Sequence, residues 1–199
     1  MTEVELYDLW CKNAKDDSDL QDELLSIKND EEAINDRFYR DLEFGTGGLR
    51  GVIGAGTNRI NIYTVRRATQ GFADYLNQEY SNPSVAISYD SRIKSDTFAK
   101  HSAAILAANG IKVYIYRELM PTPMLSFAVR QLGCTSGIVI TASHNPAKYN
   151  GYKCYDSKGY QMTDEGAAQI EALMKETDIF EDVKMGDFNA LLAEGIIEY

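Results

Sequence analysis

Three strand-like runs, separated by helix-like segments, constrain the fold of this chain more than any other feature of its sequence. Residues 85–89 form a mostly apolar run, apolar and polar side chains alternate over 111–115, and residues 138–140 are entirely apolar. A short, fully apolar run is typical of a strand buried on both faces of a parallel sheet. Because helices fit between these strands, we expect parallel pairing with right-handed crossovers.

Start and stop signals for helices lie between the strands. Ser95 is expected to cap a helix that ends near Asn109-Gly110. A second helix opens at Thr122-Pro123, with proline in its first turn, and stops near Gly133. The sequence therefore predicts an α/β fold: a mostly parallel mixed sheet with helices on both faces.

The segments on either side of this unit carry weaker patterns. Residues 45–56 contain six glycines in twelve positions, which predicts a loop, and apolar residues at helical intervals predict a helix over 62–76. After residue 140, a hairpin is expected around 156–159 and a further helix begins at Thr163.

The first 43 residues differ from the rest in pattern and in charge. Their apolar residues fall at helical intervals, which predicts short helices, and they hold 14 acidic but only 5 basic residues. We therefore divide the chain into a helical N-terminal extension, residues 1–43, packed on an α/β domain, residues 44–199. The acidic side chains are expected to lie on a solvated outer face.

The distribution of charge limits the partners of the chain. A net charge of −10 argues against nucleic acid and anionic membranes as partners. Two windows, 44–73 and 119–155, nevertheless hold basic residues and no acidic ones. This pattern reflects either chance spacing or a concave surface kept free of carboxylates for a small dianion. The basic residues in the two windows are Arg50, Arg59, Arg66, Arg67, Arg130, Lys148 and Lys153.

Cysteine and histidine content narrows the chemistry further. Three cysteines without a CxxC spacing, and two histidines, predict neither a disulfide framework nor a usual zinc site. The N-terminus lacks a basic start followed by an apolar run, and no apolar stretch reaches the length of about 18 residues that spans a membrane. We expect a cytoplasmic protein that does not enter membranes.

The most informative segment follows the apolar run at 138–140. Ligands of open α/β sheets bind outside the carboxyl ends of the strands, and Ser143 lies just past such an end. Ser143 is therefore the candidate nucleophile of the chain. The alternative is a polar turn that ends a strand, because serine, asparagine and proline are all common in turns.

Other catalytic classes fit this sequence less well. A Ser/His/Asp hydrolase is disfavoured because His144 directly follows Ser143, His101 lies within an expected helix, and no G-x-S-x-G elbow occurs. The glycine-rich segment lacks the Gly-Lys-Ser/Thr ending of a P-loop and does not visibly follow a strand. Its amides and Arg50 suit a phosphate, although a flexible entry loop is the alternative.

Two motifs connect the chain to a known family. Thr-Ala-Ser-His-Asn-Pro at 141–146, continued by Tyr-Asn-Gly-Tyr-Lys at 149–153, resembles the phosphoserine loop of the α-D-phosphohexomutases. Phe-Gly-Thr-Gly-Gly-Leu-Arg-Gly at 44–51, with Gly-Ala-Gly-Thr-Asn-Arg-Ile-Asn at 54–61, resembles the N-terminal loop of the phosphoglucomutase/phosphopentomutase branch. The similarity in sequence pattern to this family covers about residues 40–175.

The resemblance implies roles for individual residues. In that family the matching serine gives a phosphoryl group to one sugar hydroxyl and recovers one from the other, through a bisphosphorylated intermediate. Ser143 would then be the phosphoryl carrier, and Arg50 the arginine near its phosphate. Lys153 matches the proposed general acid/base toward the sugar hydroxyl, and His144 an electrostatic or hydrogen-bonding partner. The expected phosphate- and substrate-binding residues are Gly47, Gly48, Asn145 and Lys148.

The resemblance also implies partners that this chain does not supply. It implies Mg²⁺, held by Ser143 through its phosphate and by an Asp-Gly-Asp loop, and a sugar 1,6-bisphosphate activator. No Asp-Gly-Asp, Gly-Glu-Glu or Ser-Gly-Thr loop occurs here. The chain therefore looks like domain 1 of a four-domain protein, cut after Tyr199, and is expected to be inactive without the remaining domains.

The expected substrate is a hexose phosphate, interconverted between glucose 1-phosphate and glucose 6-phosphate. Three alternatives stay open. The first is specificity for a mannose, pentose or amino-sugar phosphate, the second is a stand-alone domain that binds phosphosugars or a protein partner, and the third is a sugar phosphatase.

Overall fold

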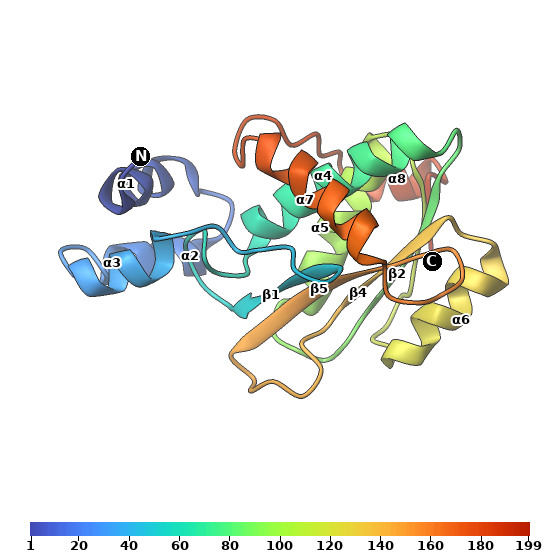
Figure 1. The fold of residues 1–199 in the computed structure, drawn as a ribbon, viewed down its shortest axis with the longest axis horizontal. Coiled ribbons are helices and arrows are strands. Elements are labelled where there is room, and N and C mark those ends of the chain that lie inside the picture. Colours follow the sequence, from blue (N-terminus) through green and yellow to red (C-terminus); the bar gives the residue numbers. More distant parts are fainter.

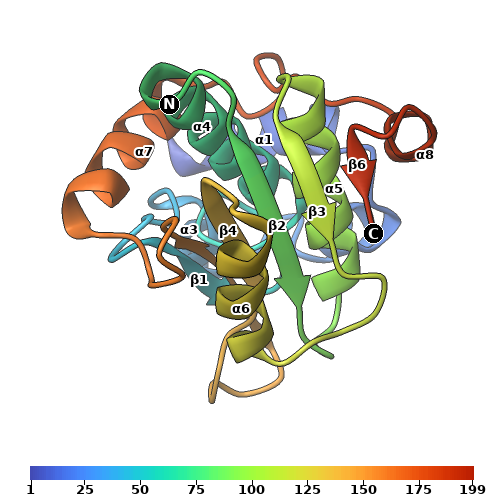
Figure 2. The ribbon, with the colours of Figure 1, turned by 90° about the vertical axis from the view of Figure 1, so that its right-hand side faces the viewer.

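The computed structural model describes residues 1–199 and shows a sheet between two helical layers (Figures 1 and 2). Helix α6 covers one face, while α4, α5 and α7 lie on the other. The strands are β1 (Gly48–Val52), β2 (Ser84–Tyr89), β3 (Lys112–Ile115), β4 (Ser136–Ile140), β5 (Tyr149–Tyr155) and β6 (Ile197–Glu198). The helices are α1 (Glu3–Asn13), α2 (Ser18–Ser26), α3 (Glu31–Phe38), α4 (Ile62–Glu79), α5 (Ser95–Ala108), α6 (Thr122–Leu132), α7 (Asp164–Glu176) and α8 (Phe188–Ala193).

The six strands follow the order β1-β5-β4-β2-β3-β6. The three pairs from β4 to β6 are parallel, whereas β4 with β5 and β5 with β1 are antiparallel. The predicted α/β class, with its mostly parallel mixed sheet, is confirmed, and β4 is buried along its whole length. The antiparallel return of β5 follows from the short segment 141–148, because a parallel crossover needs a dozen or more residues.

The glycine-rich segment is not a loop throughout, so that prediction is wrong for residues 48–52. These residues form β1 at the sheet edge, where Gly48 pairs with Lys153 and Gly51 with Asn150. A Cβ atom at Gly48 would lie 2.0 Å from the carbonyl oxygen of Tyr152. Glycine here therefore permits the close approach of two strands, a use that its turn-like composition conceals.

Local signals at helix ends have mixed outcomes. Gly133 ends α6 in the left-handed conformation with φ of 62°, and the Thr163 side chain accepts the amide of Gly166 at the start of α7, as predicted. The expected cap at Ser95 is wrong, because Lys94 is the N-cap and makes no side-chain cap bond. Ser95 Oγ instead donates to Asp90 Oδ1 at 2.9 Å, and Asp90 is the residue that directly follows β2.

The expected hairpin around residues 156–159 is present, with a short second arm. Gly159 donates its amide to the carbonyl oxygen of Asp156, and a single antiparallel bridge joins Tyr155 to Gln161. No strand follows this bridge, because residues 161–163 lead directly into α7. The predicted hairpin is confirmed, with a short second arm over residues 160–162 that pairs with the end of β5.

The three short helices predicted in the first 43 residues are present as α1, α2 and α3. The Trp10 ring of α1 is fully buried and meets Phe38, Tyr63 and Phe180 edge to face, with centroids 5.6–5.8 Å apart. Tyr63 belongs to α4, so the aromatic core continues across residue 43. The division of the chain at this residue stays a prediction. No helix in the structure has the length and apolarity needed to cross a bilayer.

Candidate functional site

Ser143 is exposed on the segment 141–148, which joins the carboxyl end of β4 to β5 and is buried only at Thr141 and Ala142. Its φ of 54° is left-handed, which is uncommon for a residue other than glycine. The Ser143 amide donates to Thr141 Oγ1 at 3.1 Å, and the Asn145 amide donates to the carbonyl oxygen of Ala142 at 3.1 Å. A tight turn therefore presents Ser143 at the strand end, which is where the sequence predicts a nucleophile.

Arg50 and Lys153 lie on one face of the sheet. Arg50 of β1 pairs with Gly151, and Lys153 of β5 lies opposite Gly48 in β1 and Val139 in β4. Paired residues share a face, and alternate residues of a strand return to it. This is the face on which α6 packs over β2 and β4. Strands β1 and β5 extend beyond that helix, so both cations stand where the sheet is open.

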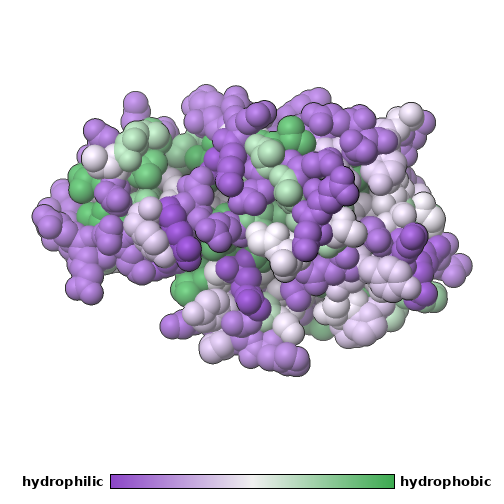
Figure 3. All heavy atoms as spheres, in the orientation of Figure 1, coloured by the Kyte–Doolittle hydropathy of each residue, from purple (hydrophilic) through white to green (hydrophobic).

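A hollow of about 420 Å³ lies at this open edge. It is lined by the cationic side chains of Arg40, Arg50 and Lys153, with Glu43 as its one carboxylate. The excess of positive charge suits an anionic ligand such as a phosphate ester. The face seen in Figure 3 is largely hydrophilic, with hydrophobic residues exposed in small groups.

A second hollow, also of about 420 Å³, lies beside Ser143. Its polar lining residues are Asp90, Ser91, Arg92, Ser143 and Asn145. The two hollows are linked where Nη1 of Arg50 donates to Oδ1 of Asn145 at 3.4 Å. The structure thus brings Ser143, Arg50 and Asn145 together, with Lys153 in the adjoining hollow.

The remaining predicted site residues are less closely associated. His144 and Lys148 are exposed on the loop, and the ammonium of Lys148 lies 5.7 Å from the ring centroid of Tyr149. The amides of Gly47 and Gly48 donate to the carbonyl oxygens of Gly45 and Phe44. These two amides are therefore already engaged within the turn rather than free to bind a phosphate.

The arginines of the acid-free window 44–73 are mostly neutralised from elsewhere in the chain. Three of the four form ion pairs with the N-terminal segment, and only Arg50 has no ion-pair partner. The pairs are Arg59 with Asp36, Arg66 with Asp16 and Arg67 with Asp41. The cationic surface is therefore smaller than the sequence predicts. These three aspartates are exposed, as expected of a solvated outer face, and each also pairs with an arginine of the α/β segment.

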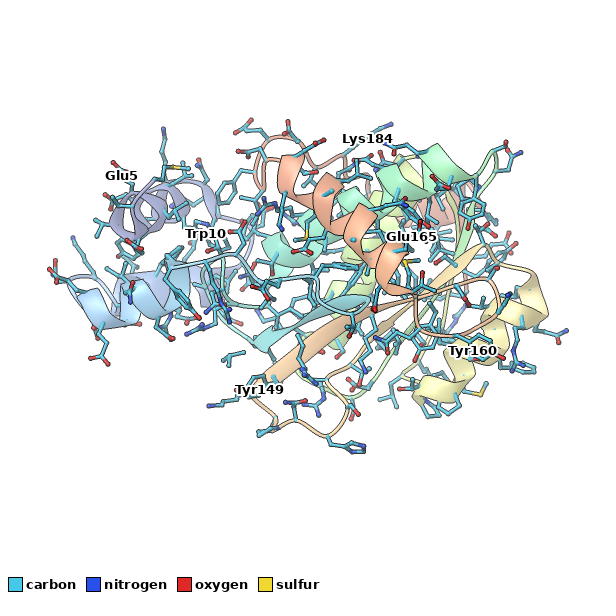
Figure 4. All side chains as sticks on the ribbon, viewed as in Figure 1. Glu5, Trp10, Tyr149, Tyr160, Glu165 and Lys184 are labelled. Carbon is cyan, nitrogen blue, oxygen red and sulfur yellow. The ribbon has the colours of Figure 1, made fainter.

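Arg92 is not among the predicted site residues, yet it is the most extensively bonded side chain at the loop. Its Nη2 donates to the carbonyl oxygens of Ser143 and Asn145 at 2.7 and 2.8 Å. Its Nη1 donates to those of Pro146 and Tyr149 at 3.1 and 3.0 Å. Tyr149 is labelled in Figure 4, where the loop meets β5. The signal that could have found Arg92 is its position just after β2, the strand beside β4.

Buried titratable groups near the site are poor nucleophiles. Burial raises the pKa of the Cys154 thiol, and it raises the pKa of the Tyr152 hydroxyl well above its usual value. Both groups therefore stay protonated at neutral pH. Ser143 is exposed at the end of β4, so it remains the candidate nucleophile.

Comparison with known proteins agrees with this architecture. The profile of the family described as phosphoglucomutase/phosphomannomutase, alpha/beta/alpha domain I, matches residues 41–180. A phosphoglucomutase of Staphylococcus saprophyticus is 40% identical over 191 residues, which are 96% of this chain and 34% of that protein. A Schizosaccharomyces pombe protein named as a probable phosphoribomutase is 43% identical over 159 residues, 78% of this chain and 27% of that protein.

Solved structures show the same relationship. A crystal structure from Thermus thermophilus, of a protein assigned as a phosphomannomutase, superposes with a TM-score of 0.66. It is 34% identical and covers 74% of this chain and 32% of that one. This chain thus spans about a third of the length of the relatives it matches. It belongs to the phosphoglucomutase/phosphomannomutase family, of which it contains the α/β/α domain I.

Proposed function

We propose that this chain is the phosphoryl-carrying domain of a phosphohexomutase that interconverts glucose 1-phosphate and glucose 6-phosphate. The observation that carries the proposal is the position of Ser143, in a left-handed turn at the end of β4 and linked through Asn145 to Arg50. The adjoining hollow, with Lys153 on its wall, has the charge to receive a sugar phosphate. The name of the Staphylococcus saprophyticus relative supports a glucose phosphate as substrate.

The proposed reaction transfers one phosphoryl group in each of two steps. In the first, a sugar hydroxyl attacks the phosphorus on Ser143, the Ser143 Oγ–P bond breaks, Lys153 in its neutral form takes the hydroxyl proton, and the Ser143 oxygen takes a proton from solvent. In the second, the Ser143 hydroxyl attacks the other phosphoryl group of the sugar bisphosphate and releases its proton to solvent, while the freed sugar oxygen takes the proton held by Lys153. Arg50 offsets the charge of the transferring group, which needs positioned cations more than covalent help. His144 is proposed to assist by electrostatics or hydrogen bonding.

The family is generally Mg²⁺-dependent. This chain groups no three His, Cys, Asp or Glu side chains as a metal-binding cluster, so its residues do not form a Mg²⁺ site by themselves. We propose that a phosphate oxygen on Ser143 supplies one ligand and that other ligands lie outside this chain. We also propose that a sugar 1,6-bisphosphate activates the protein by phosphorylating Ser143.

A pentose phosphate is the second candidate substrate. It is favoured by the relative from Schizosaccharomyces pombe, which is named as a probable phosphoribomutase. Assays of the complete protein with glucose 1-phosphate and ribose 1-phosphate, compared by kcat/KM, distinguish the two candidates. A higher value for the ribose ester would overturn the hexose assignment and leave the proposed role of Ser143 unchanged.

The test of the phosphoryl carrier uses the complete protein and three variants. Ser143→Ala should lower mutase turnover by more than about 1,000-fold and abolish labelling by a phosphate-labelled sugar bisphosphate. Lys153→Met should lower turnover by about 100- to 10,000-fold while labelling at Ser143 persists. The exposed turn residue Lys158, changed to Met, is the matched control and should keep wild-type turnover. Substantial activity in Ser143→Ala would refute the carrier role.

A further inference from the structure

We infer that Arg92 is a positioning residue, which holds the 141–148 loop in the conformation that presents the Ser143 hydroxyl for phosphoryl transfer. The inference rests on the proposed function of Ser143. Arg92 is not part of the loop that carries Ser143 but lies in the connection between β2 and α5. Arg92 lies after β2, and no direct contact with a substrate is needed for its action.

Arg92 binds the loop through backbone atoms at four positions. One guanidinium group bonds the carbonyl oxygens of Ser143, Asn145, Pro146 and Tyr149, at distances of 2.7–3.1 Å. These positions span the loop from its nucleophilic residue to the first residue of β5. A guanidinium is planar and rigid, so bonds to four carbonyl oxygens fix their relative positions.

The guanidinium has no donor left for a phosphate. Its four Nη–H groups are used by the four carbonyl oxygens, and its Nε lies 3.3 Å from Oδ2 of Asp90. The side chain is only 14% exposed. Asp90 also offsets its charge. Arg92 therefore serves to place the loop, whereas Arg50, which has no ion-pair partner, is the cation available to the transferring group.

Asp90 anchors Arg92 to the carboxyl ends of the central strands. The Asp90 amide donates to the carbonyl oxygen of Ile140, the last residue of β4, at 3.1 Å. Its Oδ1 accepts the Arg92 amide at 3.0 Å and the Ser95 hydroxyl at 2.9 Å. The Asn150 side chain in β5 donates to Ser95 Oγ at 3.0 Å. The network thus attaches the loop to the ends of β2, β4 and β5 together.

This attachment matters because Ser143 adopts an unfavourable backbone conformation. Its φ of 54° lies in the region that side chains other than glycine avoid, and such a conformation persists only where the surroundings hold it. The bond from Arg92 reaches the carbonyl oxygen of Ser143 itself. Loss of this bond releases the turn and displaces the hydroxyl, and a displacement of about 1 Å can reduce a rate about 100-fold.

The test compares Arg92→Met and Arg92→Lys with Arg67→Met in the complete protein. Arg67 is the matched control because its Nε also donates to carbonyl oxygens, those of Met174 and Thr177, at the far end of α7. We expect Arg92→Met to lower kcat about 100-fold with KM within about twofold of wild type. Arg92→Lys should retain part of the rate, because an ammonium keeps the charge but not the planar fork.

Hydrogen exchange of the amides at 142–148 provides a readout that is independent of activity. It should accelerate at least tenfold in Arg92→Met and remain unchanged in Arg67→Met, whose kcat should also be unchanged. Unaltered hydrogen exchange of the loop amides in both Arg92 variants would overturn the inference. A wild-type kcat in Arg92→Met despite accelerated exchange would overturn it as well. If Arg92→Met does not fold, Arg92→Lys decides by the same criteria. Failure of the proposed function would appear separately, as full activity in Ser143→Ala.

Discussion

The His101 side chain in α5 is held in its neutral form by its surroundings. Its Nδ1 accepts a hydrogen bond from Nε of Arg66 at 3.2 Å, which places the imidazole proton on Nε2. Burial, reinforced by the charge of Arg66 and partly opposed by Asp16 and Asp17, lowers the pKa of His101 from 6.5 to about 4. In the unfolded chain His101 therefore binds a proton below pH 6.5, whereas in the folded chain it binds this proton only near pH 4.

This linkage predicts that His101 makes the fold acid-sensitive. Its effect on stability is absent above pH 6.5 and grows as the pH falls toward 4, up to roughly 3 kcal/mol of lost unfolding free energy. Urea unfolding of wild type and His101→Gln between pH 7 and 4.5 measures the effect, and the difference between the two curves separates it from the titration of carboxylates. Parallel curves across this range would contradict the assignment.

At the scale of elements, α2 braces the glycine-rich segment that leads out of β1. Glu23 Oε2 accepts the Ala55 amide at 2.8 Å, and its Oε1 lies 3.0 Å from Nε of Arg37 in α3. A Cβ atom at Gly54 would come within 2.8 Å of the same carboxylate, and one at Gly56 within 2.6 Å of the carbonyl oxygen of Arg37. Glycine at 54 and 56 therefore lets the chain pass directly beneath the helices.

The brace predicts a cost for neutralising Glu23. Glu23→Gln keeps the shape of the side chain but removes the negative charge that accepts the Ala55 amide and pairs with Arg37. The substitution should destabilise the fold by about 1–3 kcal/mol. Asp22→Asn is the control, because Asp22 is exposed on the same helix. Urea denaturation of both variants checks the prediction. Equal stability of the two variants would show that α2 does not hold the segment through this carboxylate.

At the scale of the whole molecule, the N-terminal helices and the sheet depend on each other. Removal of residues 1–43 would expose Tyr63 and Phe180, which pack on Trp10, and would leave Arg59, Arg66 and Arg67 without ion-pair partners. Loss of a buried tryptophan alone costs about 3–5 kcal/mol, a large part of the 5–15 kcal/mol that stabilises a typical domain.

We therefore predict that residues 44–199 alone do not unfold cooperatively. Thermal melting followed by circular dichroism, together with binding of a hydrophobic dye, measures the effect. Removal of Met1 alone is the control, because this residue is 85% exposed. A sharp transition of the shortened chain near the wild-type temperature would instead show that residue 43 is a true domain boundary.

The sequence alone determined the features that depend on neighbouring residues. Apolar runs and alternation located β2, β3 and β4, and helical spacing of apolar residues located α1 to α4. Start and stop signals located α5, α6 and α7, including the end of α6 at Gly133 and the cap of α7 at Thr163. The position of Ser143 at a strand end was predictable for the same reason. Hydrophobic alternation and capping act over a few residues, so their signals survive in the sequence without knowledge of the fold.

Only the tertiary structure decided which distant residues meet. Gly48 lies in a strand because it pairs with β5, about a hundred positions later, and it is glycine because the Tyr152 carbonyl oxygen leaves no room for a Cβ atom. The N-terminal aspartates neutralise three arginines of the acid-free window, and Arg92 holds the carbonyl oxygen of Ser143 from a neighbouring strand end. Ion pairs and side-chain bonds to the backbone between distant segments leave no periodic pattern in the sequence, because chain folding alone brings the two partners within a few ångströms.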